Sequence, residues 1–383
     1  MKTVIAIDSY KESLTSLQAG KAAAEGVLAA CPDMETLIFP MADGGEGTVD
    51  ALTHGFSGEK VETIVTGPLG EPVKASLGLV EKLGTAVIEI ASACGMSLVN
   101  PERRNPLYTT SYGVGQLIKF GLDRGFRKFI IGLGGSATND GGLGMLEALG
   151  YEFYDENDNI IGPYGRDLVH IKTVNTDGKD SRLSETEFII ASDVNNPLCG
   201  PKGASHIFGP QKGADEKAVK FLDDALFHFA EISAAAGNKD CAKEPGAGAA
   251  GGLGFAFLAY LGAHIRPGVD VVIEITNLEK AIREADYIIT GEGKIDRQTS
   301  MGKAPCGVAK IAKKYDKPVI VVAGCVAQDA EVCNDFGIDG IFSIVQSPCT
   351  LEEAMDSEKA MNNLTRTVRQ IFKLISAVTS KTR

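Results

Sequence analysis

The sequence predicts an α/β protein with two domains. One is a discontinuous, Rossmann-like domain built on a doubly wound parallel sheet, and the other is an inserted domain of mixed α+β type. Three observations lead to this prediction. Strands alternate with helices at both ends of the chain, and the middle contains strands joined by short turns. At 383 residues the chain also exceeds the size at which single hydrophobic cores stop growing.

The N-terminal sixty residues predict a βαβ unit. Residues 2–8 (KTVIAID) form a β-branched run typical of a strand. Apolar residues then recur at helical spacing over 14–28, until Pro32 ends the pattern. A second strand at 35–40 leads into MADGGEGT at 41–48. The glycine- and acid-rich loop therefore follows a strand directly, as functional loops of such units do.

The middle of the chain predicts a different architecture. Three β-rich runs are separated by Gly/Pro turns too short for a crossover helix, which predicts antiparallel pairing. They span 61–66, 72–80 and 85–91. Further strands are expected at 128–133 and 187–191, with helices at 111–124 and 215–235.

From about residue 278 the strict alternation of helix and strand returns. Helices are expected at 278–285, 305–315 and 359–378, and strands at 286–290, 318–324 and 338–345. The simplest arrangement joins residues 1–62 and 278–383 in one domain, with 63–277 inserted. Because ligands bind at the carboxyl ends of parallel strands, we expect the active site in the cleft between the domains.

Composition restricts the partners. A formal net charge of −12 argues against nucleic-acid and anionic-membrane surfaces. No leader-like N-terminus and no apolar run of membrane-spanning length is visible, so a soluble, cytoplasmic protein is expected. Eight scattered cysteines without a CxxC pair disfavour zinc and indicate reduced thiols. The oligomeric state stays open, with a homo-oligomer among the alternatives.

The most informative segment follows the strand at 286–290. It carries Gly291, Glu292, Gly293, Lys294 and Asp296, which we expect to form a loop. Glycine backbone can approach phosphate, a carboxylate can hold a divalent cation, and a lysine can neutralise charge that moves between oxygens. The segment therefore predicts phosphoryl transfer.

The loops of the N-terminal unit offer similar chemistry. Asp43 and Glu46 lie among glycines after a strand and are candidates for Mg²⁺ coordination or for orienting a hydroxyl; the alternative is an acidic turn. Lys11 follows Asp8 and Ser9 at the end of the first strand, where its ammonium can reach a phosphate. A merely solvated lysine is the alternative.

Two more strand ends carry candidates. GLGGSATNDGG at 132–142 precedes a helix expected from Leu143, and such glycine loops attract phosphate or carboxylate. Its candidate residues are Gly134, Gly135, Ser136, Thr138, Asn139 and Asp140, against a purely structural glycine turn. Asp193, in SDVNNPL, suits a base or a metal ligand, although an isolated aspartate there can equally be a turn residue.

Other nucleotide motifs fail. A G-x-G-x-x-G begins at Gly246, but no strand is expected before it, so the dinucleotide fingerprint lacks its context. No Walker sequence is present, and the five histidines are isolated. A nicotinamide-dependent dehydrogenase and a non-catalytic nucleotide-binding regulator remain the less favoured alternatives.

Taken in order, these motifs resemble the bacterial class I glycerate kinase family. The matching segments cover nearly the whole chain: DSYKESL (8–14), PMADGGEGT (40–48), ASACGM (91–96), GLGGSATNDGG (132–142), SDVNNPL (192–198), PGAGAAGGLG (245–254) and TGEGKIDRQTSMGKAPCGVA (290–309). One departure is Glu12, where the family commonly has glycine.

The resemblance implies phosphorylation of D-glycerate by ATP and Mg²⁺, usually to 2-phosphoglycerate. Glycerate 3-kinase activity and another small hydroxy acid as substrate stay open. On this hypothesis Asp193 accepts the hydroxyl proton, with Asp296 as second choice. The metal ligands are Asp43 and Glu292, the neutralising lysines are Lys11 and Lys294, and the candidates for the glycerate carboxylate are Ser92, Arg103 and Arg104.

Overall fold

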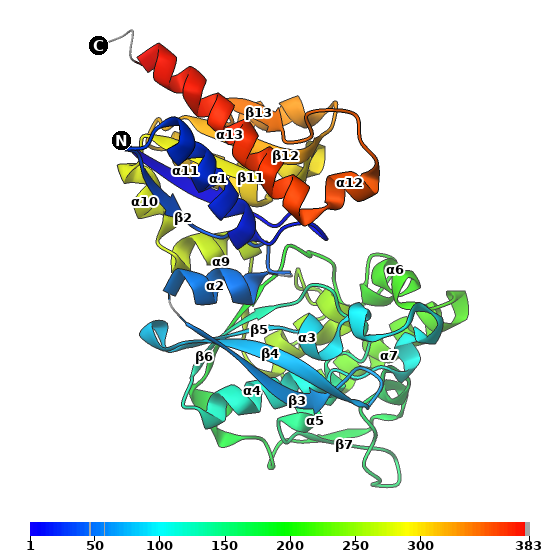
Figure 1. Cartoon of the computed structure of the whole chain (residues 1–383). Coiled ribbons are helices and arrows are strands. Elements are labelled where there is room, and N and C mark those ends of the chain that lie inside the picture. The colour runs from blue at the N-terminus through cyan, green and yellow to red at the C-terminus, as the bar shows by residue number, and fades with distance from the viewer. Residues whose placement is uncertain (46, 57, 380–383) are drawn as a thin grey trace. The chain divides into compact units, whose positions relative to one another are not determined.

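A computed structural model describes residues 1–45, 47–56 and 58–379 of the protein (Figure 1). The chain divides into two compact units. Unit 1 comprises Met1–Asp43, Asp50–Phe56 and Val269–Arg383, and unit 2 comprises Gly44–Val49 and Ser57–Gly268. The boundaries expected from the sequence, after residues 62 and 277, differ from these divisions by several residues.

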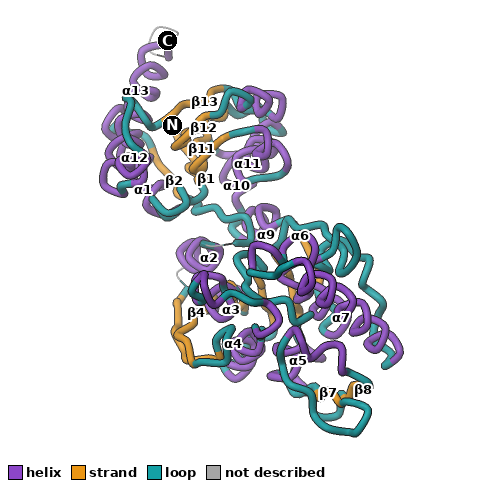
Figure 2. The backbone as a smooth tube through the Cα atoms, turned by 90° about the vertical axis from the view of Figure 1, so that its right-hand side faces the viewer, coloured by secondary structure: helices purple, strands orange, loops and turns teal. Residues whose placement is uncertain are grey.

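Unit 1 contains a five-stranded sheet of order β13-β12-β11-β1-β2 in which every pair is parallel. The strands are β1 (Lys2–Ile7), β2 (Glu35–Ile38), β11 (Tyr287–Ile295), β12 (Val319–Val326) and β13 (Gly340–Ser343). Figure 2 shows α1 (Ser16–Ala30) and α13 (Ser357–Thr379) on one face, with α10 (Leu278–Glu284) and α11 (Ala304–Lys313) on the other. The predicted parallel α/β class is therefore confirmed.

The helix pair α1 and α13 shows how sequence determines packing in unit 1. Thr15 and Gln18 form a capping box at the start of α1, which satisfies backbone groups there. Small residues then allow the two helices to approach closely: a Cβ on Gly26 would lie 2.6 Å from the Thr365 carbonyl. Phe372, fully buried, packs with Ile5 and Ile289 beneath these helices. This core holds β1 and β11 in place.

Unit 2 contains a six-stranded mixed sheet of order β10-β9-β6-β5-β4-β3. The pairs β3–β4 and β4–β5 are antiparallel, as the short turns predict, and the remaining pairs are parallel. The strands are β3 (Glu59–Thr66), β4 (Pro72–Val80), β5 (Thr85–Glu89), β6 (Lys128–Gly132), β9 (Glu187–Ala191) and β10 (His264–Arg266), with a separate pair β7 (Glu152–Tyr154) and β8 (Thr173–Asn175).

The helices of unit 2 surround an aromatic core in which Phe129 stacks on Phe188 at 5.4 Å between ring centres. They are α3 (Ala91–Cys94), α4 (Tyr112–Asp123), α5 (Leu143–Ala148), α6 (Ala204–Phe208), α7 (Glu216–Ala235) and α8 (Leu253–Tyr260). Three further helices are α2 (Thr48–Phe56), α9 (Gly268–Ile275) and α12 (Leu351–Met355). None of the helices in the described ranges is long and apolar enough to cross a membrane.

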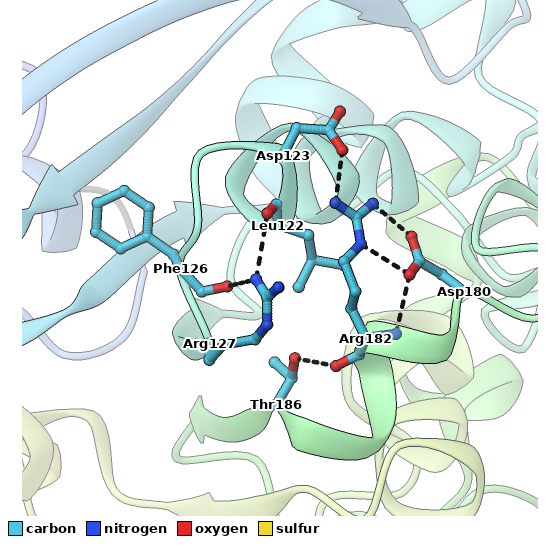
Figure 3. Close-up of polar contacts among 7 residues, drawn as sticks. All are labelled: Leu122, Asp123, Phe126, Arg127, Asp180, Arg182 and Thr186. Atoms are coloured by element: carbon cyan, nitrogen blue, oxygen red, sulfur yellow. Dashed lines mark hydrogen bonds and ion pairs between the residues drawn. The ribbon is translucent and has the colours of Figure 1, made fainter.

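An arginine network fixes the chain where α4 leads into β6 (Figure 3). Arg182 donates to both carboxylate oxygens of Asp180, at 2.9 and 2.7 Å, and to Asp123 at 2.8 Å. These bonds hold the pKa of the Asp180 carboxyl below its usual range. Arg127 donates to two backbone carbonyls nearby. The network is structural, because it ties the end of a helix to the segment before β9.

One local prediction was wrong. The segment expected as a loop, 291–296, continues strand β11 as far as Ile295. Lys294 and Ile295 still pair with Cys325 and Val326 of β12, because β12 extends alongside β11 to Val326. β1, in contrast, pairs only as far as Gly291. The charged residues after Gly291 therefore lie on a strand that remains paired with β12. Among the described residues, only the edge that faces β1 is unpaired there.

Candidate active site

A cavity of about 690 Å³ lies in unit 1, lined mainly by the segments after β1 and β2, the C-terminal parts of β11 and β12, and the end of β13 with the residues that follow it. β1 leads to β2 at one edge of the sheet, whereas β11 leads to β12 and β13 at the other. The boundary between β1 and β11 is thus the point at which the strand order reverses, and open parallel sheets bind ligands at such points. The cavity is the first candidate for a ligand site.

The segment after β1 is fastened to the neighbouring strands. Asp8 donates its backbone N–H to the Gly291 carbonyl at 2.9 Å, and the buried Tyr10 hydroxyl donates to the Val322 carbonyl at 2.8 Å. These bonds reach β11 and β12. Lys11, which follows, is exposed and lines the cavity, so its ammonium is available to an anion there.

Glu12 is the residue at which this chain departs from the glycine of the family pattern. Its φ is +63°, in the left-handed region that costs residues with a Cβ about 1 kcal/mol and that glycine adopts freely. The chain therefore places a glutamate in a backbone conformation that glycine adopts with less strain. The turn closes through the backbone bond from Ser13 N–H to the Tyr10 carbonyl.

Glu292 is buried at the wall of the cavity and is 7% exposed. It accepts a hydrogen bond from the Thr299 hydroxyl at 2.5 Å, and the Lys303 ammonium lies 3.6 Å from its other oxygen. Burial raises the pKa of the Glu292 carboxyl, while Thr299 and Lys303 oppose that shift. Both oxygens of Glu292 are thereby oriented.

Carboxylates gather at this end of the cavity. Burial, together with the nearby charges of Asp43 and Glu292, raises the pKa of Asp8 to about 7. The positive charge of Lys11 opposes this rise in pKa only weakly. Such mutual repulsion favours the binding of a cation.

The described residues contain no preformed group of three or more His, Cys, Asp or Glu able to hold a metal. Mg²⁺ does not require one, because it commonly takes one or two carboxylates and completes its shell with water and substrate phosphates. The crowded carboxylates next to a cavity therefore fit Mg²⁺ that arrives with a phosphate ligand. Glu46, predicted beside Asp43, lies outside the described residues.

Lys294 and Asp296 form a pair, with 3.0 Å between Nζ and Oδ2. Lys294 lines the cavity, but Asp296 is not among the lining residues in the described part of the chain. Asp296 instead caps the 3₁₀ helix Arg297–Met301, accepting the Gln298 N–H at 2.9 Å. Lys294 thus lines the cavity, and its role toward phosphate stays a prediction, whereas Asp296 caps a helix.

In unit 2, buried side chains hold the loop Gly134–Asp140 in place. Gly135 is exposed, whereas Thr138, Asn139 and Asp140 are fully buried. Asp140 accepts the N–H and hydroxyl of Ser111, both at 2.7 Å, and caps α5 through Gly142 and Gly144. A ligand can thus reach Gly134 and Gly135, while the buried side chains hold the loop in shape. The glycine run at 245–254 packs against this loop, because a Cβ on Gly252 would lie 2.8 Å from Gly141.

Lys212 contacts the same loop, although nothing in the sequence pattern indicated this contact. Its side chain is buried and 3% exposed, and its ammonium donates to the Ser136 hydroxyl at 2.9 Å and the Thr138 carbonyl at 2.7 Å. Burial lowers the pKa of Lys212 to about 8, against an opposing contribution from Asp140. The loop is therefore fixed by a buried charge that only the tertiary structure shows.

The remaining predicted residues also lie in unit 2. Ser92 donates to the Glu89 and Ser76 carbonyls at 2.9 and 3.2 Å. Arg103 is exposed and pairs with Glu71 at 3.1 Å, and Arg104 lies 3.4 Å from the carbonyls of Met96 and Val99. Asp193 is exposed after β9 and accepts the Gly268 N–H at 3.3 Å.

The sequence interpretation overlooked Lys303. It stands at the N-cap of α11, lines the cavity and pairs with Glu292. Its one signal was a Gly-Lys pair at 302–303 without the Ser or Thr of a Walker motif. The structure thus brings together Lys11, Asp43, Glu292, Gly293, Lys294 and Lys303 around one cavity.

A parallel α/β sheet with lysines and carboxylates at its switch point defines an enzyme class that handles anionic substrates. Comparison with known proteins makes this specific. A model of the glycerate kinase family matches residues 3–376. The chain belongs to the glycerate kinase family.

Relatives at close to half identity span the whole chain. The "Glycerate kinase" of Haemophilus influenzae is 47% identical over 380 residues, covering 98% of this chain and 99% of that protein. The "Glycerate 2-kinase" of Escherichia coli K12 is 47% identical over 371 residues, covering 97% of each. A crystal structure from Salmonella typhimurium LT2, whose protein is provisionally named glycerate kinase 2, superposes with a TM-score of 0.91 at 44% identity and covers 99% of both chains.

Proposed function

We propose that this enzyme transfers the γ-phosphoryl group of ATP to the 2-hydroxyl of D-glycerate, giving 2-phosphoglycerate and ADP. The family supports the reaction class, and the Escherichia coli relative bears the name of a 2-kinase. The observation that carries the proposal is the cavity at the β1–β11 switch point, where three lysines and three carboxylates meet.

The chain's own residues supply charge neutralisation and positioning, which account for most of the catalysis in phosphoryl transfer. Lys11 and Lys294 approach the phosphate oxygens, and Lys303 joins them beside Glu292. Asp43 and Glu292 would hold Mg²⁺, directly or through water. When bound, Mg²⁺ withdraws charge from the phosphate oxygens.

The substrate hydroxyl must lose its proton as its oxygen bonds to the γ-phosphorus and ADP leaves. We assign that proton to Asp193 and keep Asp296 as a weaker alternative, because Asp296 already caps a helix and pairs with Lys294. For the glycerate carboxylate we keep Ser92, Arg103 and Arg104, together with the backbone of Gly134 and Gly135. The predicted location of the reaction between the two units, a cytoplasmic setting and a homo-oligomer all stay predictions.

The test of the activity is ADP release on addition of D-glycerate, L-glycerate, glycolate and lactate to ATP and Mg²⁺. We expect turnover with D-glycerate above all, and a ³¹P NMR spectrum of the product that matches 2-phosphoglycerate. A 3-phosphoglycerate spectrum would reassign the attacking hydroxyl. No D-glycerate-dependent ADP release would refute the kinase assignment.

The test of the base is Asp193→Asn. The change keeps the hydrogen-bond acceptor for Gly268 but removes the basic oxygen, so we expect kcat to fall by about 10²–10⁴ with the fold retained. Asp177→Asn, an exposed aspartate of the same unit, is the matched control. Unchanged turnover in Asp193→Asn would remove this residue from the mechanism.

A further inference from the structure

The cavity of unit 1 has an apolar wall that the charge chemistry described so far does not use. We use the term apolar wall for six residues that line the cavity: Val326, Ile344, Val345, Leu351, Ala354 and Met355. Leu351 is 78% exposed and Val326 is 37% exposed, and α12, which carries Leu351 and Met355, has no buried residue. An apolar surface of this kind inside a cavity indicates an apolar ligand group.

The wall has a defined backbone. Thr350 and Glu353 form a capping box at the start of α12, with the Thr350 hydroxyl accepting the Glu353 N–H at 3.2 Å and Glu353 accepting the Thr350 N–H at 3.0 Å. Lys359, at the start of α13, lies 3.5 Å from Glu353. The helix is thus anchored on its polar side while Leu351 stays exposed.

Polarity changes across the cavity in the order of the strands. The lysines and carboxylates come mainly from the segment after β1 and the C-terminal part of β11, with Asp43 and Lys303 beside them. The apolar wall comes from the end of β12, the segment after β13 and α12. Neighbouring strands are about 4.8 Å apart, so β1 and β13, with two strands between them, are separated by roughly 14 Å. The site therefore suits an elongated ligand that is anionic at one end and apolar at the other.

We propose that unit 1 binds the nucleotide, with the triphosphate among Lys11, Lys294 and Lys303 and the base on the apolar wall of β12, β13 and α12. The inference rests on the proposed kinase function and deepens it, because it assigns one of the two substrates to one unit. Glycerate, a small polyhydroxy acid, has no apolar group to cover this wall. A cavity of about 690 Å³ falls in the range of roughly 300–1,000 Å³ found for small-molecule sites.

The experiment distinguishes the contribution of the base to binding from that of the phosphates. Binding of ATP and of tripolyphosphate, each with Mg²⁺ and without glycerate, is measured by calorimetry for the wild type and for Leu351→Ser. Because Leu351 is mostly exposed, its replacement leaves the core intact. We expect Kd for ATP to rise about tenfold and Kd for tripolyphosphate to stay unchanged. Met355→Gln is a second variant with the same expectation.

The matched control is Leu374→Ser, which removes an exposed leucine of α13 that does not line the cavity. It should leave both affinities unchanged. Lys11→Met, in contrast, should weaken ATP and tripolyphosphate alike. In steady-state assays Leu351→Ser should raise KM for ATP and leave KM for glycerate and kcat unchanged.

Two outcomes overturn the inference: an unchanged ATP affinity in Leu351→Ser and Met355→Gln, or an equal loss for ATP and tripolyphosphate. Either would assign the wall to another occupant. Failure of the proposed function is distinguishable, because then the wild type binds ATP with these same dependences but releases no ADP upon addition of glycerate.

Discussion

Lys212 gives the most quantitative prediction, because its ammonium is buried where water cannot solvate it. A pKa lowered from 10.5 to about 8 corresponds to roughly 3 kcal/mol of lost folding free energy at neutral pH. Below pH 8 the lysine is protonated in both the folded and the unfolded chain, so the full cost is present. Between pH 8 and 10.5 the folded protein releases the proton first, and stability rises with pH.

The variant Lys212→Met removes this charge and keeps the length of the side chain. From pH 7 to pH 9.5 the wild type should gain about 2 kcal/mol relative to Lys212→Met. The comparison uses a change with pH, so the loss of the hydrogen bonds to Ser136 and Thr138 contributes equally at both values. Lys220→Met, which removes an exposed lysine of the same unit, should run parallel to the wild type.

The chain has no tryptophan, but its buried thiols report on each unit separately. Protein equilibrated in urea at pH 7 or 9.5 is pulse-labelled with a maleimide at one common pH, and the cysteine peptides are read by mass spectrometry. Cys94 and Cys241 report unfolding of unit 2, and Cys306 and Cys333 that of unit 1. Parallel pH profiles of wild type and Lys212→Met at the unit 2 thiols would refute the reasoning, since the ammonium would then not be desolvated.

The remaining predictions concern unit 1 and use the labelling midpoints of its thiols. Glu12→Gly should stabilise unit 1 by about 0.5–1 kcal/mol by relieving the left-handed backbone, and a lower midpoint would contradict the strain. Gly291→Ala should destabilise it by about 2 kcal/mol or more, because the new methyl group would collide with the Val322 carbonyl; an unchanged midpoint would show that β12 can shift. Tyr10→Phe should cost about 1 kcal/mol through the lost bond to the Val322 carbonyl, and no loss would mean that water replaces the hydroxyl.

Local sequence signals predicted much of the fold because each depends on a few neighbouring residues. The apolar runs of β1, β4 and β9 were found at or within one residue of their bounds, since β-branched residues and turn signals mark them. The end of β11 was missed because glycine and charge usually indicate a loop. Pairing with β12, such as that of Lys294 with Cys325 thirty-one residues away, keeps that segment extended.

Among the site residues, too, those marked by local sequence signals were predicted and those defined by distant contacts were not. Lys11, Asp43 and Glu292 could be proposed from the sequence because each stands at or near the end of a recognisable strand. Lys303, Lys212 and the apolar wall could not, because their role depends on which side chain or cavity they face. Asp140 shows the reverse case: the sequence marks a glycine loop with an acid, and burial turns that acid into a cap for α5.

The pairing of β1 with β11 also has a consequence for biosynthesis. Ala6 and Thr290, bonded across these strands, are 284 positions apart in the chain. At about 5–20 residues per second, the ribosome needs roughly 15–60 s to reach the partner of a strand it made at the start. Unit 2, nearly continuous from residue 57 to 268, can close in that interval.

During that time the nascent N-terminus carries β1 and β2, but β11, the other sheet neighbour of β1, does not yet exist. Its apolar residues Val4, Ile5 and Ile7, buried in the final fold, are then open to chaperones and to other nascent chains. Because Lys11 follows β1 and the strand partners of β1 lie near residue 290, assembly of the cavity is one of the last events of synthesis.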